Sequence, residues 1–158
     1  MKQSVKKGAF FGLTSGVITT LGLIVGLNSG THSVSVVVGG ILIIAIADAL
    51  SDALGIHISE ETASPDDHNQ VWVSTIFTFV SKFFMALSFL IPVLLFELTT
   101  AIWISVIWGL GVISVLSWYI ARSQGKRPLA VIGEHLAIAV VVLVITHYVG
   151  ISVSRYFG

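Results

Sequence analysis

The sequence contains no cysteine among its 158 residues. Without thiols the chain cannot form a disulfide, a thiolate metal site or a cysteine nucleophile. Charge is also scarce, because only 10% of the residues are Asp, Glu, Lys or Arg, against about 25% in soluble domains. The formal net charge is zero. The sequence therefore gives no electrostatic support for nucleic-acid binding.

The motifs of common enzyme classes are missing as well. The sequence has no H-E-x-x-H, no G-x-S-x-G and no glycine-rich phosphate loop. Asp48 and Asp52 lie in an apolar stretch, a pattern that could indicate an aspartyl protease. Such a dyad joins acids from different segments, whereas these two are adjacent on one segment. We therefore expect neither an enzyme nor a bound cofactor.

Apolar residues dominate what is present. They make up 55% of the chain, and the mean hydropathy is +0.98. About 20 apolar residues in a helix are enough to cross the hydrocarbon layer. The sequence predicts an all-α, polytopic membrane protein that forms a single transmembrane domain over residues 1–158. We expect five transmembrane helices, at about 8–28, 34–58, 65–96, 100–121 and 128–153, with a short acidic loop at 59–71.

The basic residues indicate the orientation. With five spans, nearly all of them fall on the side that holds the N-terminus, and Arg155 falls on the other side. Cytosolic loops carry an excess of Lys and Arg, so the N-terminus is expected in the cytosol. The protein would be a multi-pass component of the plasma membrane in a prokaryote, or of a vacuole-type membrane in a eukaryote. The residues that set this orientation are Lys2, Lys6, Lys7, Arg122, Lys126 and Arg127.

Two aspartates in the second span are the most unusual feature. At 100° per residue, Asp48 and Asp52 lie one above the other on a helix face that also carries Ser51, Gly55 and Ser59. Two carboxylates that close repel, so either one is protonated or a cation lies between them. Both states would serve a transporter. The alternative is a neutral, hydrogen-bonded pair that holds helices together.

The first span carries small residues on one face, where they fall within about a quarter of the helix circumference. Small residues at this spacing allow close helix packing in lipid. Ser15 and Thr19 also offer oxygens to a pore or to Asp48. Packing alone is the alternative interpretation for the glycines. The face consists of Gly8, Gly12, Ser15, Thr19, Gly22 and Gly26.

A lysine and several histidines admit two interpretations each. Lys82 in the third span either pairs with an acid of the second span or extends to the cytosolic interface, and we expect the latter. Glu134 and His135, near the start of the fifth span, are either interfacial or part of an ion entrance. His57 points away from the aspartates, so no ligand role is expected for it.

The loop at 59–71 is rich in acids, among them Glu60 and Glu61. Carboxylates attract divalent cations such as Mn²⁺ and Fe²⁺. Their spacing matches no metal motif, so a solvated acidic loop with weak cation attraction is the expected role.

The order of these features resembles the vacuolar iron transporter family. GLTSGVITTLGLIVGL (12–27) is similar to the first span of that family, and ALSDALGIHISEE (49–61) to its second. The longest similar segment is ARSQGKRPLAVIGEHLAIAVVVLVITHYVG (121–150). The resemblance implies a homodimer of five-helix protomers with the ion path between helices one and two. It also implies export of Fe²⁺ or Mn²⁺ from the cytosol by proton exchange.

Three departures from the family pattern bear on the substrate. Ser15 stands where the family usually has an aspartate, and Asp52 where it usually has a methionine. The long cytosolic metal-binding helices are replaced by residues 59–71. Exchanging a thioether for a carboxylate moves a site toward harder cations.

The sequence thus supports a divalent-cation transporter in which Asp48 and Asp52 bind metal and protons in turn. Ser15 and Thr19 would be auxiliary ligands, and Glu60 and Glu61 would concentrate cations at the cytosolic mouth. Two alternatives stay open: a non-transporting scaffold or regulatory protein, and a transporter of another cation or of protons alone.

Overall fold

The computed structural model describes residues 2–63 and 66–157, and helices form almost all of this part of the chain. Three consecutive elements, α2, η1 and α3, run as one continuous helix, and α4 and α5 follow each other across a short break. In chain order the elements are α1 (Lys2–Thr31), α2 (Val34–Ile43), η1 (Ile44–Asp48), α3 (Ala49–Ala63), α4 (His68–Ser88), α5 (Leu90–Leu95), α6 (Leu98–Ser123) and α7 (Pro128–Phe157).

Five helices in the described residues are long and apolar enough to cross a membrane, which confirms the predicted number of such helices. Four of them extend beyond the predicted range at one end or both, whereas the third lies within the predicted 65–96. The second helix continues to Ala63, so much of the segment expected as a loop at 59–71 is helical. The predicted start of the third helix at Ser64 and Pro65 lies outside the described residues. The five long apolar helices are Lys2–Thr31, Val34–Ala63, His68–Leu95, Leu98–Ser123 and Pro128–Phe157.

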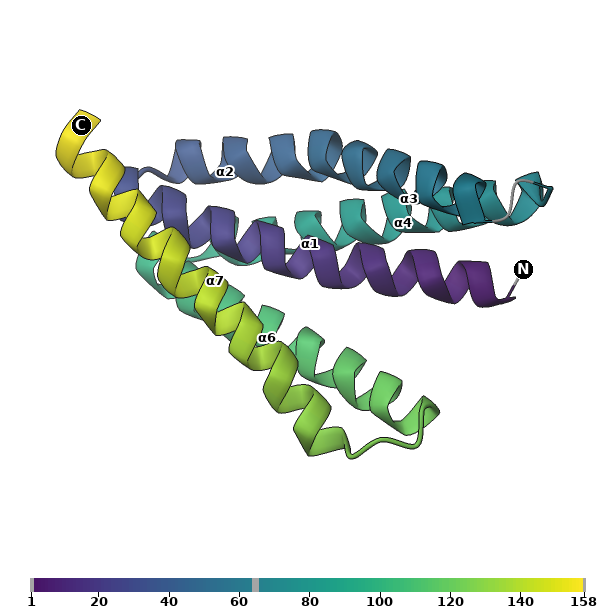
Figure 1. Cartoon of the computed structure of the whole chain (residues 1–158). Coiled ribbons are helices and arrows are strands. Elements are labelled where there is room, and N and C mark those ends of the chain that lie inside the picture. Colours follow the sequence, from purple (N-terminus) through teal and green to yellow (C-terminus); the bar gives the residue numbers. More distant parts are fainter. Residues whose placement is uncertain (1, 64–65, 158) are drawn as a thin grey trace.

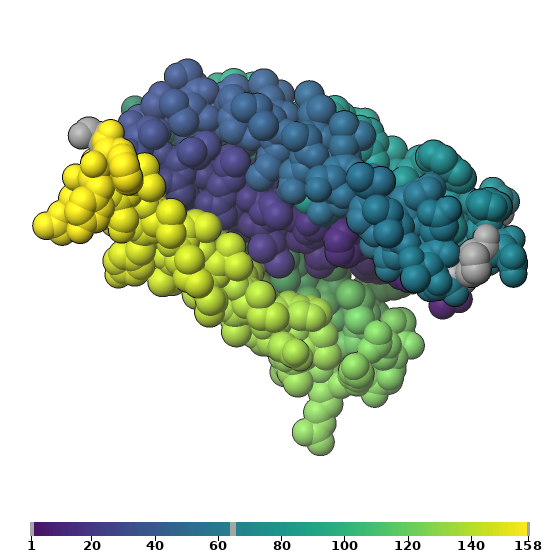
Figure 2. Space-filling model, turned by 45° about the horizontal axis from the view of Figure 1, so that its top comes forward, coloured from purple at the N-terminus to yellow at the C-terminus, as the bar shows by residue number. Residues whose placement is uncertain are grey.

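Helix α1 lies at the centre of the fold and packs against α2, α4, α6 and α7. Figure 1 shows α1 between the continuous α2–α3 helix on one side and the crossing helix α7 on the other. The α6–α7 hairpin diverges from the N-terminal half of α1, and its tip projects from the rest of the molecule in Figure 2. The bundle therefore has a basic end, defined by the α1 N-terminus and the α6–α7 turn, and an opposite end where α1 and α7 finish.

The glycines of α1 form two separate packing surfaces. Gly8, Gly12 and Gly16 face α4, where an added Cβ on Gly12 would lie 2.5 Å from the carbonyl oxygen of Thr78. Gly22, Gly26 and Gly30 face α7 instead, against Thr146 and Gly150. Gly26 follows Gly8 by 18 residues, which is five full turns, so the two sets lie on one face of α1 at different heights and meet different helices there. Close packing of small residues, the alternative interpretation of this stripe, accounts for these glycines.

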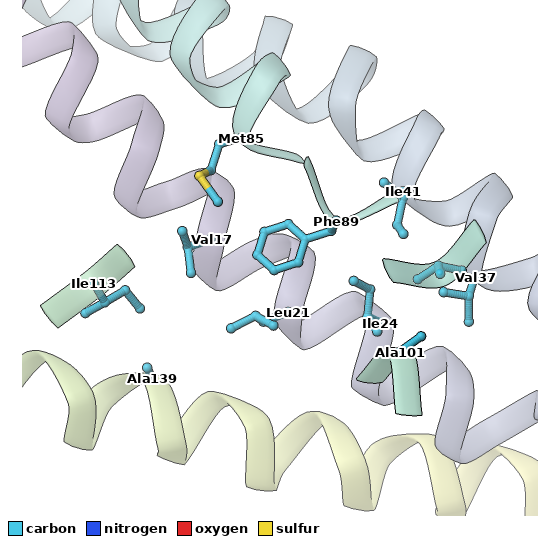
Figure 3. Close-up of a cluster of buried hydrophobic side chains, with 11 residues drawn as sticks. Val17, Leu21, Ile24, Val37, Ile41, Met85, Phe89, Ala101, Ile113 and Ala139 are labelled. Carbon is cyan, nitrogen blue, oxygen red and sulfur yellow. The ribbon is translucent and has the colours of Figure 1, made fainter. Parts of the chain in front are cut away.

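The hydrophobic core lies between α1, α2 and the junction of α4 with α5. Figure 3 shows Phe89 pointing toward α1, near Val17 and Leu21, with Ile41 of α2 on its other side. All four side chains are buried. Helix α7 contributes little to this core, because only Ala139 and Gly150 are buried among its described residues.

Two local irregularities shape the second and third spans. The α4 helix ends at Ser88 and α5 begins at Leu90, because the ring of Pro92 excludes the carbonyl of the residue four positions earlier from a regular helix. In the second span the segment Ile44–Asp48 is a π-helical turn. Such turns widen the helix locally and often occur at functional sites. Asp48 is the last residue of this turn.

Candidate functional site

Lys82 is held in the interior of the protein by α4. This helix presents Ser74, Thr78 and Lys82 to α1, where glycines let the two backbones approach closely. Lys82 has no exposed surface at all. It lies 14 residues after the first residue of α4, about 21 Å along the axis at 1.5 Å per residue. A lysine side chain cannot cover that distance to the basic end.

The prediction that Lys82 extends to the cytosolic interface is therefore wrong. Its Nζ lies 2.5 Å from Asp48 Oδ2 and 2.6 Å from Asp52 Oδ2, so it pairs with both acids of the second span. The physical reason is the cost of an unpaired charge in a dry interior, which pairing with carboxylates reduces. Pairing was the other interpretation of this residue.

Ser15 of α1 completes this group of side chains. Lys82 Nζ donates a hydrogen bond to Ser15 Oγ at 2.9 Å, and Ser15 Oγ in turn donates to Asp52 Oδ2 at 2.6 Å. The ammonium thus has three oxygen neighbours: it donates hydrogen bonds to Ser15 and Asp52 and forms an ion pair by distance with Asp48. We call these four residues, Ser15, Asp48, Asp52 and Lys82, the acid–lysine cluster.

The cluster is closed on its lysine side and partly open on its acid side. The side chains of Asp48 and Asp52 are 30% and 22% exposed, whereas that of Lys82 is fully covered. With both carboxylates ionised and the ammonium charged, the cluster carries one net negative charge. Asp48 Oδ2 accepts no hydrogen bond within the described part of the chain, although it pairs with Lys82 by distance. The carboxylates therefore keep capacity for a further cation.

The other predicted site residues lie outside the cluster. The Thr19 hydroxyl donates to the backbone carbonyl of Ser15, at 2.9 Å, and not to an aspartate. Glu60 pairs with Lys7 of α1 near the basic end, and Glu61 is exposed beside it. Glu60 follows Asp52 by eight residues, about 12 Å along the helix. The structure thus brings together Asp48, Asp52 and Ser15 of the predicted set.

The histidines make separate contacts. His57 Nδ1 lies 3.0 Å from Thr75 Oγ1, and its ring meets Trp72 edge-on, away from the aspartates as expected. His135 Nδ1 lies 2.8 Å from Ser117 Oγ in the α6–α7 hairpin. The Ser117 hydroxyl already donates to the carbonyl of Ile113, so His135 is the donor in this pair. Neither histidine is part of the acid–lysine cluster.

Within residues 2–63 and 66–157 no group of three or more His, Cys, Asp or Glu side chains could hold a metal ion. A divalent cation at the cluster would meet two carboxylates and the Ser15 hydroxyl. Hard cations such as Mn²⁺ and Mg²⁺ prefer oxygen ligands of this kind. These three ligands suit a cation that binds transiently better than one that is held permanently.

Comparisons with known proteins give no further guide, because no family model, no curated protein and no solved structure matches the chain. The resemblance to the vacuolar iron transporter family therefore rests on the residues quoted from the sequence.

Proposed function

We propose that this protein is a divalent-cation transporter that exports Fe²⁺ or Mn²⁺ from the cytosol in exchange for protons. Asp48 and Asp52 form the binding site within the membrane. One observation carries the proposal: the ammonium of Lys82 occupies the position between the two carboxylates, while the carboxylates stay partly open. The site is thus built to hold positive charge and is accessible from its acid side.

Exchange follows from competition for the same two oxygens. Asp48, Asp52 and a charged Lys82 together carry a net charge of −1. A divalent cation that binds both carboxylates would meet the ammonium at close range, and like charges repel strongly in an apolar surrounding. Metal binding therefore requires Lys82 to give up its proton, and metal release lets the cluster take a proton back. Each metal ion that leaves in one direction is thus matched by proton movement in the other.

The surrounding residues have supporting roles in this proposal. Ser15 bonds to both Lys82 and Asp52, so it can turn its oxygen toward a cation at the acids. Glu60 and Glu61 attract cations at the basic end, which faces the cytosol under the positive-inside rule. Lys7 holds Glu60 in the resting arrangement and would be displaced by an arriving cation.

The proposal includes a homodimer that meets through helices one and two. Part of the helix face that carries Asp48 and Asp52 is left uncovered in a single chain, where Ser51, Gly55 and Ser59 are all exposed. The open side of the two carboxylates lies on this face. A second copy placed there would bring four carboxylates together and give a divalent cation more oxygen ligands.

Transport can be tested with purified protein in liposomes that carry a metal-sensitive dye and a pH-sensitive dye together. The wild type should move Mn²⁺ or Fe²⁺ with an opposite movement of protons. Asp52→Asn should abolish metal flux and leave the oligomeric state unchanged. Glu97→Gln is the matched control, because Glu97 is an exposed acid outside the cluster, and it should transport normally. Wild-type metal flux in the Asp52→Asn variant would reject the site.

A second candidate function is a non-transporting membrane scaffold or regulatory protein. It is favoured by the complete pairing of the Lys82 ammonium, which a purely structural ion pair would also show. The same liposomes separate the two, since a scaffold moves neither metal nor protons. Proton movement without metal flux would instead indicate a transporter of protons alone.

A further inference from the structure

A cavity of about 520 Å³ lies between α1, α6 and α7 at the end opposite the basic end. Its volume is typical of pockets that hold a small molecule or part of a lipid. No residue of the acid–lysine cluster lines it, so it is separate from the proposed transport site. Its walls come from the last turns of α1, the first turns of α6 and the middle turns of α7.

The outer level of the cavity is polar. Asn28 and Ser29 near the end of α1, Thr99 at the start of α6, and His147 with Tyr148 on α7 all line it. Ser29 Oγ lies 2.6 Å from His147 Nδ1, so these two side chains join α1 to α7 across the cavity edge. The level therefore offers hydroxyl, amide and imidazole groups close to the place where α1 ends and α6 begins.

The deeper level is apolar. Val25 precedes the polar residues of α1, Ile102 and Val106 follow Thr99 into α6, and Leu143 and Val144 precede His147 in α7. On each of the three helices, polar residues thus lie toward the outer end of the cavity, and aliphatic residues lie deeper. The cavity is ordered from polar to apolar along the direction in which the helices would cross a membrane.

From this order we propose that the cavity binds one membrane phospholipid. An acyl chain fills the deeper level, and the ester and phosphate oxygens accept hydrogen bonds at the outer level. Among the described residues the lining includes no Asp, Glu, Lys or Arg. Recognition thus depends on the glycerol-phosphate region common to phospholipids and not on the charge of the headgroup. The lipid fills the space where α7 leans across α1 beside its contact through Gly26 and Gly150.

Native mass spectrometry of protein released from mixed-phospholipid nanodiscs tests this site. The wild type should retain one phospholipid per chain at activation energies that remove the annular lipids. Val144→Trp places an indole in the cavity and should reduce that retention at least fivefold. Val141→Trp is the matched control, because Val141 lies on the same helix with a similar exposed fraction, 55% against 48%, and does not line the cavity. It should retain the lipid as the wild type does.

A second variant keeps the test decisive if Val144→Trp disturbs folding. His147→Ala removes a donor of the outer level without adding volume, and it should also lower retention severalfold. Equal retention in Val144→Trp, His147→Ala and Val141→Trp would overturn the proposal. So would a wild type that holds only detergent or a second copy of the chain at this site. Retention of one headgroup class alone would contradict the inference that the shared glycerol-phosphate region is recognised.

Discussion

Lys82 Nζ lies 2.6 Å from Asp52 Oδ2, and the lysine has no exposed surface while the aspartate is partly open. This relationship defines the resting state of the site, because the positive charge that compensates the acids is part of the protein. Under the proposed function, a cation that binds these acids would therefore have to displace the ammonium. In apolar surroundings, the loss of one charge from the cluster leaves the opposite charge without compensation, so each charge stabilises the others.

Removal of the lysine should destabilise the protein. Lys82→Met keeps the length of the side chain but leaves two partly buried carboxylates without their counter-charge. Loss of one partner of a buried ion pair typically costs about 3–5 kcal/mol. We expect a clear drop in the thermal unfolding midpoint in detergent, whereas Lys126→Met, at an exposed turn, should shift the free energy of unfolding by less than about 0.5 kcal/mol.

A double variant checks whether this loss comes from charge. Lys82→Met combined with Asp52→Asn restores the net charge of −1, so part of the stability should return. The double variant should then be more stable than Lys82→Met alone, with a coupling free energy of about 1 kcal/mol or more. Additive losses in the two single variants would contradict the pairing of Lys82 with Asp52.

The contact of α1 with α4 depends on the absence of a side chain at Gly12. A methyl group there would lie 2.5 Å from the backbone oxygen of Thr78, which cannot move without shifting α4. Overpacking of this kind costs about 1–3 kcal/mol. Gly12→Ala should therefore lower the unfolding midpoint, and it should weaken the proposed transport because Ser15 follows about one turn later.

The control for this change is Gly55→Ala. A methyl group on Gly55 meets no atom within 4 Å, and this glycine lies in a helix interior, where alanine is favoured by about 1 kcal/mol. Its stability should be equal to that of the wild type or higher. A Gly12→Ala variant with wild-type stability would show that α1 and α4 are not in close contact at this point.

The start of α4 should depend on pH through Asp67. Hydrogen bonds from the side chain and the backbone of Gln70 hold the pKa of Asp67 below its usual value of 3.8. A depressed pKa in the folded state means that this stabilisation is present above pH 3.8 and is lost as the pH falls through the lower folded value. The helix start should then fray in acid.

A substitution that removes the cap tests this effect at neutral pH, and amide hydrogen exchange is the measurement. In Asp67→Ala the amide of Gln70 loses its side-chain acceptor and keeps only the backbone carbonyl of residue 67, so it should exchange faster than in the wild type. Asp66→Ala is the control, because Asp66 precedes the cap and is exposed. Equal exchange of Gln70 in both variants would show that Asp67 does not cap the helix.

Much of the fold could be predicted because apolar length is a strong signal. The five long runs of apolar residues predicted five spans, and the two aspartates predicted a polar group on the second span. The division of the α1 glycines between α4 and α7 could not be predicted, because the residues on one helix face do not indicate which helices pack against it. The π-helical turn that ends at Asp48 had no signal in the residues Ile44–Ile46 either.

The burial of Lys82 could have been predicted from its place in the middle of the third long apolar segment. A residue in the middle of a span about 30 residues long is too far from either end for a lysine to reach water. The partners were harder to infer, since contact between α4 and the second span depends on tertiary packing. Ser15 bridges Lys82 and Asp52 only because α1 and α4 approach closely at Gly12 and Gly16.

The most direct test of the account is the release of protons when Mn²⁺ binds to purified protein in weakly buffered detergent solution. If the metal and the Lys82 ammonium compete for Asp48 and Asp52, each bound Mn²⁺ should release about one proton, as the charge of the cluster requires. Asp52→Asn should bind little metal and release none. Mn²⁺ binding at these acids without proton release would contradict the central claim that the two cations exclude each other.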